Sequence, residues 1–238
     1  MDNASYTTLT RQSGLMQEMQ VVANNIANAA TTGFRAEGVM FSEHVVALGP
    51  DSPSLSMAKA AVRETIMTQG TLTQTGGSFD LAIEGEGFFL IDTPAGQRLT
   101  RSGAFQPNEN GDLVTADGHP VLDAGGAPVF LPQGTGRIGI SPDGTISAGG
   151  QPVGQIGLVV PTDPNGLIRE SGVMFAAPAG FGPAPTPRMI QGFLEDSNVN
   201  PILQVARMIE VQRAYELGQS FLENEHERIR GVIQAIRS

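Results

Sequence analysis

The sequence of 238 residues has no cysteine, no tryptophan and a single lysine, Lys59. Without cysteine the chain can form no disulfide, no thiolate nucleophile and no cysteine-based zinc site. Basic residues are scarce, since 14 Lys and Arg stand against 24 Asp and Glu, and the net charge is −10. A general nucleic-acid-binding protein carries the opposite sign because it must neutralise phosphates, so this class of protein is excluded.

Long apolar runs are missing as well. No stretch approaches the roughly 18 consecutive apolar residues of a membrane-spanning helix. The first 20 residues have neither the basic start nor the apolar run of a secretory signal. We therefore expect no membrane span, and we expect any export to use a route without a cleaved signal.

Glycine and proline are abundant, with 30 and 16 residues, and they are concentrated in the middle of the chain. From about Thr75 to Ile190, short apolar runs such as Phe88–Ile91 alternate with pairs of turn residues. A strand and a turn at intervals of about 8–12 residues predict an all-β domain of hairpins. The residues of these turn pairs tolerate positive φ, and examples are Asn110-Gly111, Asp117-Gly118, Asp143-Gly144 and Asn165-Gly166.

A weak internal repeat lies within this region. The segment from Asn110 to Val121 resembles the segment from Asp143 to Val153: each has a turn pair, an apolar run and then Pro-Val. We interpret the similarity as a duplicated hairpin unit.

Helical periodicity marks the N-terminal region. Between Ser5 and Ala30, apolar residues recur every seven positions as Leu9, Met16 and Ala23. This pattern predicts an amphipathic helix. A glycine after the last periodic residue is a common helix terminator, and Gly33 has this position.

A second helix is predicted at the other end of the chain. Asn200 is suited to the N-cap and Pro201 to the first helical position. No proline follows, and a seven-residue apolar series extends from Met208 to Ile236. A continuous helix of this length spans roughly 54 Å, more than a sheet of about 20 Å can cover.

The patterns together predict an α+β fold: an all-β, hairpin-rich central domain flanked by long N- and C-terminal helices that pair as a coiled coil. We assign residues 1–34 to an N-terminal axial helix, 35–74 to a linker or extended arm, 75–190 to the central β-domain and 191–238 to a C-terminal axial helix.

Pairing of the two helices would leave apolar flanks in water, namely Leu15, Val22, Val211 and Val232. We expect other subunits to cover them. When the covering surface differs from the covered one, the contact repeats into a ring or an open helical array.

Several motifs for chemistry are set aside. The three histidines do not have metal-ligand spacing. The segment Gly134–Gly139 has the letters of a dinucleotide fingerprint, but Ser141-Pro142 follows it where a helix would be needed. Ser56-Met57-Ala58-Lys59 has the spacing of a serine–lysine nucleophile but lacks the second lysine motif. The acidic residues Glu84, Glu86 and Asp92 fit the wet face of a hairpin. We predict no cofactor, no metal and no enzymatic activity.

Two sets of residues near the termini resemble signatures of one protein family. Ala23–Asn28 with Thr31–Phe34, and Ser197–Pro201 with Gln212–Glu216, resemble the terminal signatures of flagellar rod, hook and hook-associated axial proteins. Thr100–Phe105 resembles the central β-domain of the longer rod proteins. Within the family, the chain is most similar to proximal rod proteins, with distal rod proteins second.

The resemblance implies a structural subunit of the bacterial flagellar basal-body rod, exported through the flagellar type III apparatus and stacked into the hollow periplasmic drive shaft. It implies self-association and contact with neighbouring rod proteins. The residues that we expect at the assembly interface are Leu9, Met16, Met19, Ala23, Asn24, Asn25, Ile26, Asn28, Thr32, Gly33, Phe34, Asn198, Asn200, Met208, Ile209, Arg213, Tyr215, Leu222, Ile229 and Ile236.

Two interpretations of other classes stay open. One is a soluble β-domain that binds a ligand or a polysaccharide, with the helices as a private dimerisation stalk. The other is an enzyme built on Glu84 and Glu86.

Overall fold

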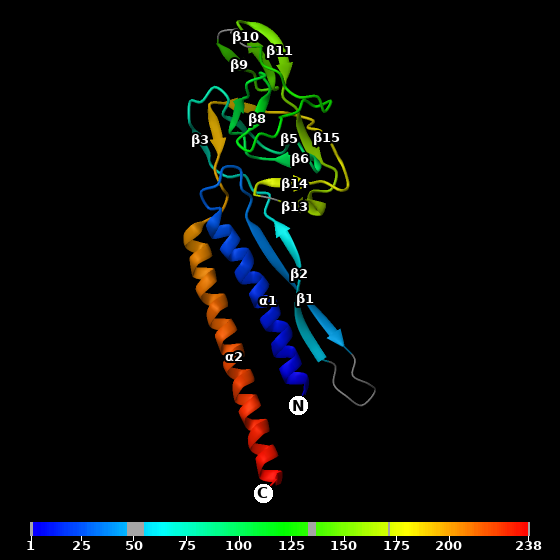
Figure 1. Cartoon of the computed structure of the whole chain (residues 1–238), viewed down its shortest axis with the longest axis vertical. Helices are drawn as coiled ribbons and strands as arrows, with labels where there is room; N and C mark the ends of the chain where they lie inside the picture. The colour runs from blue at the N-terminus through cyan, green and yellow to red at the C-terminus, as the bar shows by residue number, and fades with distance from the viewer. Residues whose placement is uncertain (1, 47–54, 133–136, 171, 238) are drawn as a thin grey trace. The chain divides into compact units, whose positions relative to one another are not determined.

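The computed structural model describes residues 2–46, 55–132, 137–170 and 172–237 (Figure 1). The chain divides into two compact units, which are described separately. The first comprises the described residues of Met1–Ala27, Glu37–Ile66 and Asn200–Ser238, and the second those of Asn28–Ala36 and Met67–Val199. The mixed architecture confirms the prediction of two terminal helices and a central β-rich domain.

The first unit contains two long helices, α1 (Asp2–Ala27) and α2 (Pro201–Arg237). The predicted cap of α2 is confirmed, because the side-chain oxygen of Asn200 accepts hydrogen bonds from the backbone N–H groups of Ile202 and Leu203, at 3.1 and 3.2 Å. Helix α1 ends three residues earlier than predicted. Asn28 begins a turn there, in which its carbonyl accepts from the N–H of Thr31 at 3.1 Å.

The two helices lie side by side and antiparallel (Figure 1). Asn25 near the end of α1 donates to Gln204 near the start of α2 (3.4 Å), whereas Gln12 donates to the carbonyl of Tyr215 (3.3 Å). Between these contacts, Arg207 donates to Glu18 at 2.6 Å. The helices therefore pair within one chain, and their supercoiling stays a prediction.

The contact uses different apolar columns from those predicted. Leu15, Val22 and Val211, which we expected to be left in water, are buried, whereas Leu9 and Met16 of the predicted seam are exposed. Of the four predicted flank residues, only Val232 is exposed. Adjacent residues on a helix differ by about 100° in direction, so two neighbouring apolar columns have nearly the same period and only packing decides which one faces inward.

An antiparallel hairpin completes the first unit. Strands β1 (Glu37–Val46) and β2 (Leu55–Thr65) pair from Glu37 opposite Thr65 to Val46 opposite Leu55, with a bulge between Met40 and Phe41. Both strands contact α1. The segment 35–74, predicted as a linker or extended arm, thus contains a hairpin, and its residues 50–54 lie outside the described part of the chain.

The second unit is built from short antiparallel strands. Its largest sheet has the order β13-β14-β6-β5-β12-β15, a three-stranded sheet has the order β11-β10-β9, and three pairs are β16-β4, β17-β3 and β7-β8. The strands are β3 (Leu72–Gln74), β4 (Leu81–Ile83), β5 (Phe88–Thr93), β6 (Gly96–Thr100), β7 (Phe105–Pro107), β8 (Leu113–Thr115), β9 (Ile138–Ile140), β10 (Thr145–Ala148), β11 (Gln151–Gln155), β12 (Leu158–Pro161), β13 (Ile168–Arg169), β14 (Met174–Ala176), β15 (Phe181–Pro183), β16 (Met189–Gln191) and β17 (Phe193–Glu195).

Strand β5 lies between two apolar clusters. Phe89 and Ile91 belong to the larger cluster, and Phe88 and Leu90 belong to the smaller one. Because successive side chains of a strand point to opposite faces, the continuous apolar run Phe88–Ile91 buries both faces of β5.

Three of the four predicted turns have a glycine with positive φ: Gly111, Gly118 and Gly144 have φ of 90, 83 and 87°. The fourth turn, at Asn165-Gly166, takes another form: Pro164–Gly166 is a short 3-10 helix, and Gly166 does not have a positive φ. Pro164 fixes the first φ of this turn, and the side chain of Asp163 accepts from the N–H of Asn165 at 3.0 Å.

The internal repeat is visible in the backbone hydrogen bonds. Gly111 donates to Asn108 three residues earlier, just as Gly144 donates to Ser141. The carbonyl of Gly111 accepts from Leu131, and that of Gly144 accepts from Ile156. The first apolar residue of each unit, Leu113 or Ile146, is fully buried. The two units therefore share a turn geometry as well as a sequence pattern.

Candidate assembly interface

The outer face of α1 exposes part of the predicted interface. Leu9 and Met16, one heptad apart, are 52% and 46% exposed, and Ala23 continues the same column. Met19 and Ile26 are half-buried. Because Leu15 and Val22 already make the intrachain contact, the Leu9–Met16 face has no apolar cover among the described residues of its own unit.

Helix α2 divides the predicted residues between two environments. Met208, Tyr215 and Leu222 are half-buried, whereas Arg213 is exposed. The exposed apolar residues of the predicted set are Ile209, Ile229 and Ile236. The interface prediction thus combines residues of the intrachain helix pair with residues that face water.

The three asparagines of the N-terminal signature lie at the end of α1. Asn25 is buried, and its amide donates to the backbone carbonyl of Glu37 (2.8 Å) while its oxygen accepts from the N–H of Glu37 (2.9 Å). Asn24 donates to the Glu37 carboxylate at 3.5 Å, and Asn28 accepts from Thr31. Asn25 therefore holds the first residue of β1 against α1 and acts within the chain.

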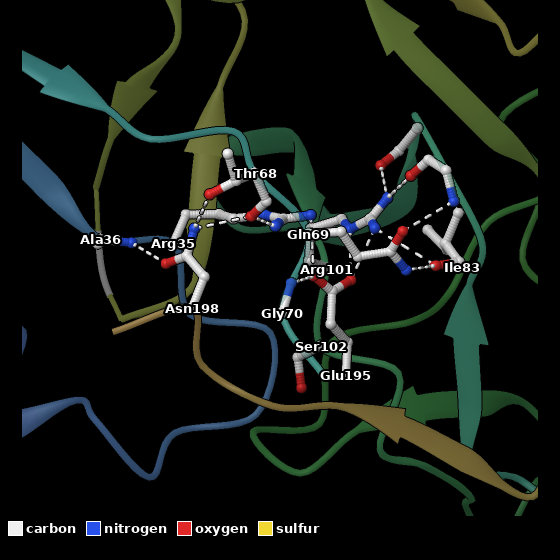
Figure 2. A network of polar contacts seen from close by, with 12 residues as sticks. Arg35, Ala36, Thr68, Gln69, Gly70, Ile83, Arg101, Ser102, Glu195 and Asn198 are labelled. Atoms are coloured by element: carbon white, nitrogen blue, oxygen red, sulfur yellow. Dashed lines mark hydrogen bonds and ion pairs between the residues drawn. The ribbon is translucent and has the colours of Figure 1, made fainter. Parts of the chain in front are cut away.

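The second unit contains a buried ionic cluster, which sequence analysis did not identify (Figure 2). The carboxylate of Glu195 lies between two guanidinium groups: Arg35 contacts Oε1 at 2.9 Å, and Arg101 contacts Oε2 at 2.7 Å. All three side chains are at most 4% exposed. Glu195 also accepts from the N–H of Gly70 at 2.9 Å. We call Arg35, Arg101 and Glu195 the ionic clamp.

Other donors of the two arginines bind backbone carbonyls. Arg101 donates to the carbonyl of Gly87 at 2.6 Å and to that of Gly85 at 3.0 Å. Arg35 donates to the carbonyl of Thr68. Because Asn198 binds the same Thr68 carbonyl at 2.8 Å, the clamp extends to the residues just before α2.

The clamp joins the chain segments that lead into the elements of the first unit. Arg35 lies two residues before β1, Thr68 lies three residues after β2, and Asn198 lies three residues before α2. Asn198 also accepts from the N–H of Ala36 at 2.6 Å. Three segments far apart in the sequence are therefore fastened at one place (Figure 2).

Gly33 and Phe34 of the predicted interface also belong to this region. Gly33 has a φ of +70° and donates to the backbone carbonyl of Glu195 at 2.7 Å. A Cβ at this position would lie 2.3 Å from the backbone nitrogen of Ser102, so only glycine fits. Phe34 is buried, and the guanidinium of Arg169 lies 4.4 Å from its ring centroid. Thr32 is half-buried in the same turn.

Burial shifts the titration of the arginines. Desolvation, followed by repulsion from Arg101, lowers the pKa of Arg35 to about 10, although Glu195 opposes the shift. Burial also lowers the pKa of Arg101. In both arginines burial is the largest cause of the shift, since desolvation disfavours the charged guanidinium.

The residues considered for other chemistry do not assemble into a site. Glu84, Glu86 and Asp92 are exposed, and Glu84 pairs with Arg188 at 3.3 Å. Among the residues that the structure describes, no group of three His, Asp or Glu side chains could hold a metal ion. The fingerprint-like segment 134–139 has residues 134–136 outside the described part, and its next residues enter strand β9. None of the described helices has the length and apolarity to cross a membrane.

Arg101 and Glu195 could have been found through their context. Arg101 directly follows Leu99-Thr100, and Glu195 directly follows Phe193-Leu194, which are apolar or β-forming residues. A charged side chain next to such a strand is buried only if it has a partner of opposite charge. Arg35 is 66 positions from Arg101 and 160 from Glu195 in the sequence, so no local pattern relates the three.

The chain thus combines two terminal helices that expose apolar side chains with a β-rich unit that contains a buried ionic clamp. Three family models match the chain: "Flagella basal body rod protein" over residues 6–35, "Flagellar hook protein FlgE/F/G D1 domain" over 82–148, and "Flagellar basal body rod FlgEFG protein C-terminal" over 190–235.

Full-length relatives agree with these models. The flagellar basal-body rod protein FlgF of Caulobacter vibrioides is 39% identical over 99% of this chain and 98% of its own length. FlgF of Mesorhizobium japonicum is 41% identical over 91% and 90%. The rod protein FlgG of Bacillus subtilis is 29% identical over 98% of both chains. The chain therefore belongs to the flagellar basal-body rod protein family, and its FlgF relatives are more similar than this FlgG relative.

Proposed function

We propose that this chain is a structural subunit of the proximal part of the flagellar rod, polymerising through the outer faces of α1 and α2 into the hollow shaft that transmits torque and encloses the export channel. Distal rod or hook-type axial subunits are the alternative within the family. The greater identity to FlgF relatives favours the proximal position.

The exposed apolar residues of the helices carry this proposal. Leu9, Met16, Ile209, Ile229 and Ile236 are each at least 38% exposed in the single chain. Burying an apolar side chain of this size contributes about 1.5–3 kcal/mol. Since the five residues are between 38% and 80% exposed, about half of their apolar surface is still to be buried, which represents roughly 4–8 kcal/mol. This amount is comparable with the stability of a small domain.

The proposed partners are further copies of this chain and neighbouring rod proteins. We propose that the flagellar type III apparatus exports the chain and that it functions in the periplasmic rod. An enzymatic role has no support from the described acidic residues, since Glu84 and Glu86 are exposed. We therefore propose a purely structural role without a cofactor.

A single charged substitution tests the role of the helix surface. Met16→Asp introduces a carboxylate on the exposed face of α1, and Ile168→Asp does the same on β13, where Ile168 is 55% exposed. Both variants should fold, as measured by circular dichroism and thermal melting. We expect cells with Met16→Asp to lose swimming in soft agar and cells with Ile168→Asp to swim normally. Normal swimming with Met16→Asp would contradict the proposal.

A further inference from the structure

The stripe of α2 that faces α1 follows a regular spacing of three and four residues. Contacts with α1 fix its direction, because Gln204 bonds Asn25, Val211 is buried and Gly218 approaches Gln12 so closely that a Cβ would lie 3.1 Å from its amide nitrogen. The stripe consists of Gln204, Met208, Val211, Tyr215, Gly218, Leu222 and Glu225. The same spacing continues to Ile229, Val232 and Ile236.

Helix α1 does not follow the stripe to its end. Since the helices are antiparallel and Gln12 lies opposite Tyr215 and Gly218, the described start of α1 at Asp2 falls near Glu227. Beyond this level α2 continues alone among the described residues (Figure 1). The exposed fractions of Ile229, Val232 and Ile236 accordingly rise from 38% to 50% and 80%. We call these three residues the terminal stripe.

We propose that the terminal stripe is covered by the Leu9–Met16 face of α1 from a second copy of this chain. This inference rests on the proposed function and names the two surfaces that meet. Continuity supports it: the terminal stripe prolongs an interface that is occupied by α1 over its preceding turns. This side of α2 therefore already packs against an α1 helix over most of its length.

The spacing of the two surfaces agrees. Ile229 and Ile236 are seven residues apart, as are Leu9 and Met16, so each pair spans about 10.5 Å along its helix. An antiparallel arrangement like that within the chain places Ile236 beside Leu9 and Ile229 beside Met16. One copy contributes the terminal stripe and the other contributes the Leu9–Met16 face, so each copy keeps one of the two surfaces free. The same contact can therefore be repeated from copy to copy along an array.

The absence of cysteine makes a direct test possible. Two single-cysteine variants with different epitope tags are co-expressed in cells that lack the native chain, and disulfide formation is induced in isolated basal bodies. We expect Leu9→Cys with Ile236→Cys, and Met16→Cys with Ile229→Cys, to form dimers that carry both tags. The crossed pairs, Leu9→Cys with Ile229→Cys and Met16→Cys with Ile236→Cys, should not react, because a seven-residue shift of about 10.5 Å exceeds the roughly 7 Å limit between bonded Cα atoms.

Leu217→Cys serves as the matched control, since Leu217 is 73% exposed on α2 but lies outside the stripe. It should give no dimer with Leu9→Cys. Two outcomes would overturn the inference while the proposed function stands. The first is dimer formation by the crossed pairs or by the Leu217 control. The second is the lack of any dimer in basal bodies that contain both variants and support swimming. Folded variants that never enter basal bodies, together with a native chain that is also absent there, would overturn the proposed function itself.

Discussion

The two units differ in how much of their apolar surface is buried within the chain. In the second unit, strand β5 is enclosed on both faces and even a carboxylate, Glu195, is buried with its counter-charges. In the first unit, one column of each helix is buried by the other helix, while Leu9 and Ile236 remain in water. The comparison shows that the β-rich unit buries its apolar strands within one chain, whereas the helical unit keeps part of its apolar surface exposed.

The largest expected effect lies in the clamp. Glu195→Gln leaves two buried guanidinium groups without a counter-charge, and breaking a buried ion pair in this way costs about 3–5 kcal/mol. Chemical denaturation should show this loss at pH 7. Glu170→Gln is the control, because Glu170 is 41% exposed in its pair with Arg98 and should lose less than about 1 kcal/mol.

The pH dependence sharpens this prediction. Glu195 raises the pKa of Arg35 against the larger effect of burial, so its removal lowers the pKa of Arg35 below about 10. The unfolded chain then binds more protons than the folded one at alkaline pH, and stability rises with pH there. The deficit of the variant should therefore shrink between neutral and alkaline pH. A constant or growing deficit would contradict this account.

A second effect concerns the backbone at the clamp. Gly33→Ala combines a strained φ of +70° with a contact of 2.3 Å to Ser102, and we expect a loss of about 2–4 kcal/mol. Gly118→Ala has a similar φ of +83° but nothing within 4 Å, so it should lose only about 1–2 kcal/mol. Equal losses in thermal melting would show that the close approach is unimportant.

A smaller effect is expected where the hairpin meets α1. Asn25→Ala removes both the acceptor for the N–H of Glu37 and the donor to its carbonyl, and leaving these buried groups unpaired should cost about 1–3 kcal/mol. Hydrogen exchange of the Glu37 amide should become faster, while amides in β5 should be unaffected. Unchanged exchange at Glu37 would argue against a role for Asn25 within the chain.

The smallest effects on stability should come from the exposed helix face. Leu9→Ser and Met16→Ser should change the unfolding free energy by less than about 0.5 kcal/mol, whereas Leu15→Ala in the buried column should cost about 2–5 kcal/mol. Denaturation of the isolated chain measures both. A large loss of unfolding free energy in Leu9→Ser would contradict the difference in burial between the column of Leu9 and that of Leu15.

The helices and the hairpin domain could be predicted because their signals are local. Asn200-Pro201 marks the start of α2, and the turn glycines mark the hairpins, since each depends on residues close in sequence. The inward column of the helices could not be chosen, because Leu9 and Leu15 both have helical spacing. The hairpin β1–β2 was missed because its alternation is weak and α1 supplies part of its packing.

The candidate site shows the same division. The sequence identified the exposed residues Leu9, Met16, Ile229 and Ile236, and their assembly role stays a prediction. It also placed Asn25, Gly33, Phe34 and Asn198 at the interface, whereas the structure gives these residues contacts within the chain. The clamp depends on residues that only the tertiary fold brings together, so periodicity could not detect it.

The meeting of three segments at Glu195 has a mechanical consequence. Tension on the strand after Arg35, on the strand before Thr68 or on the lead into α2 reaches bonds that share one anchoring acid and its neighbours. Bonds that bear a load in parallel must break together. The free-energy barrier to pulling out one of the three segments therefore includes the bonds that hold the other two. The resistance of this part of the second unit to shear therefore depends on a few side chains around Glu195.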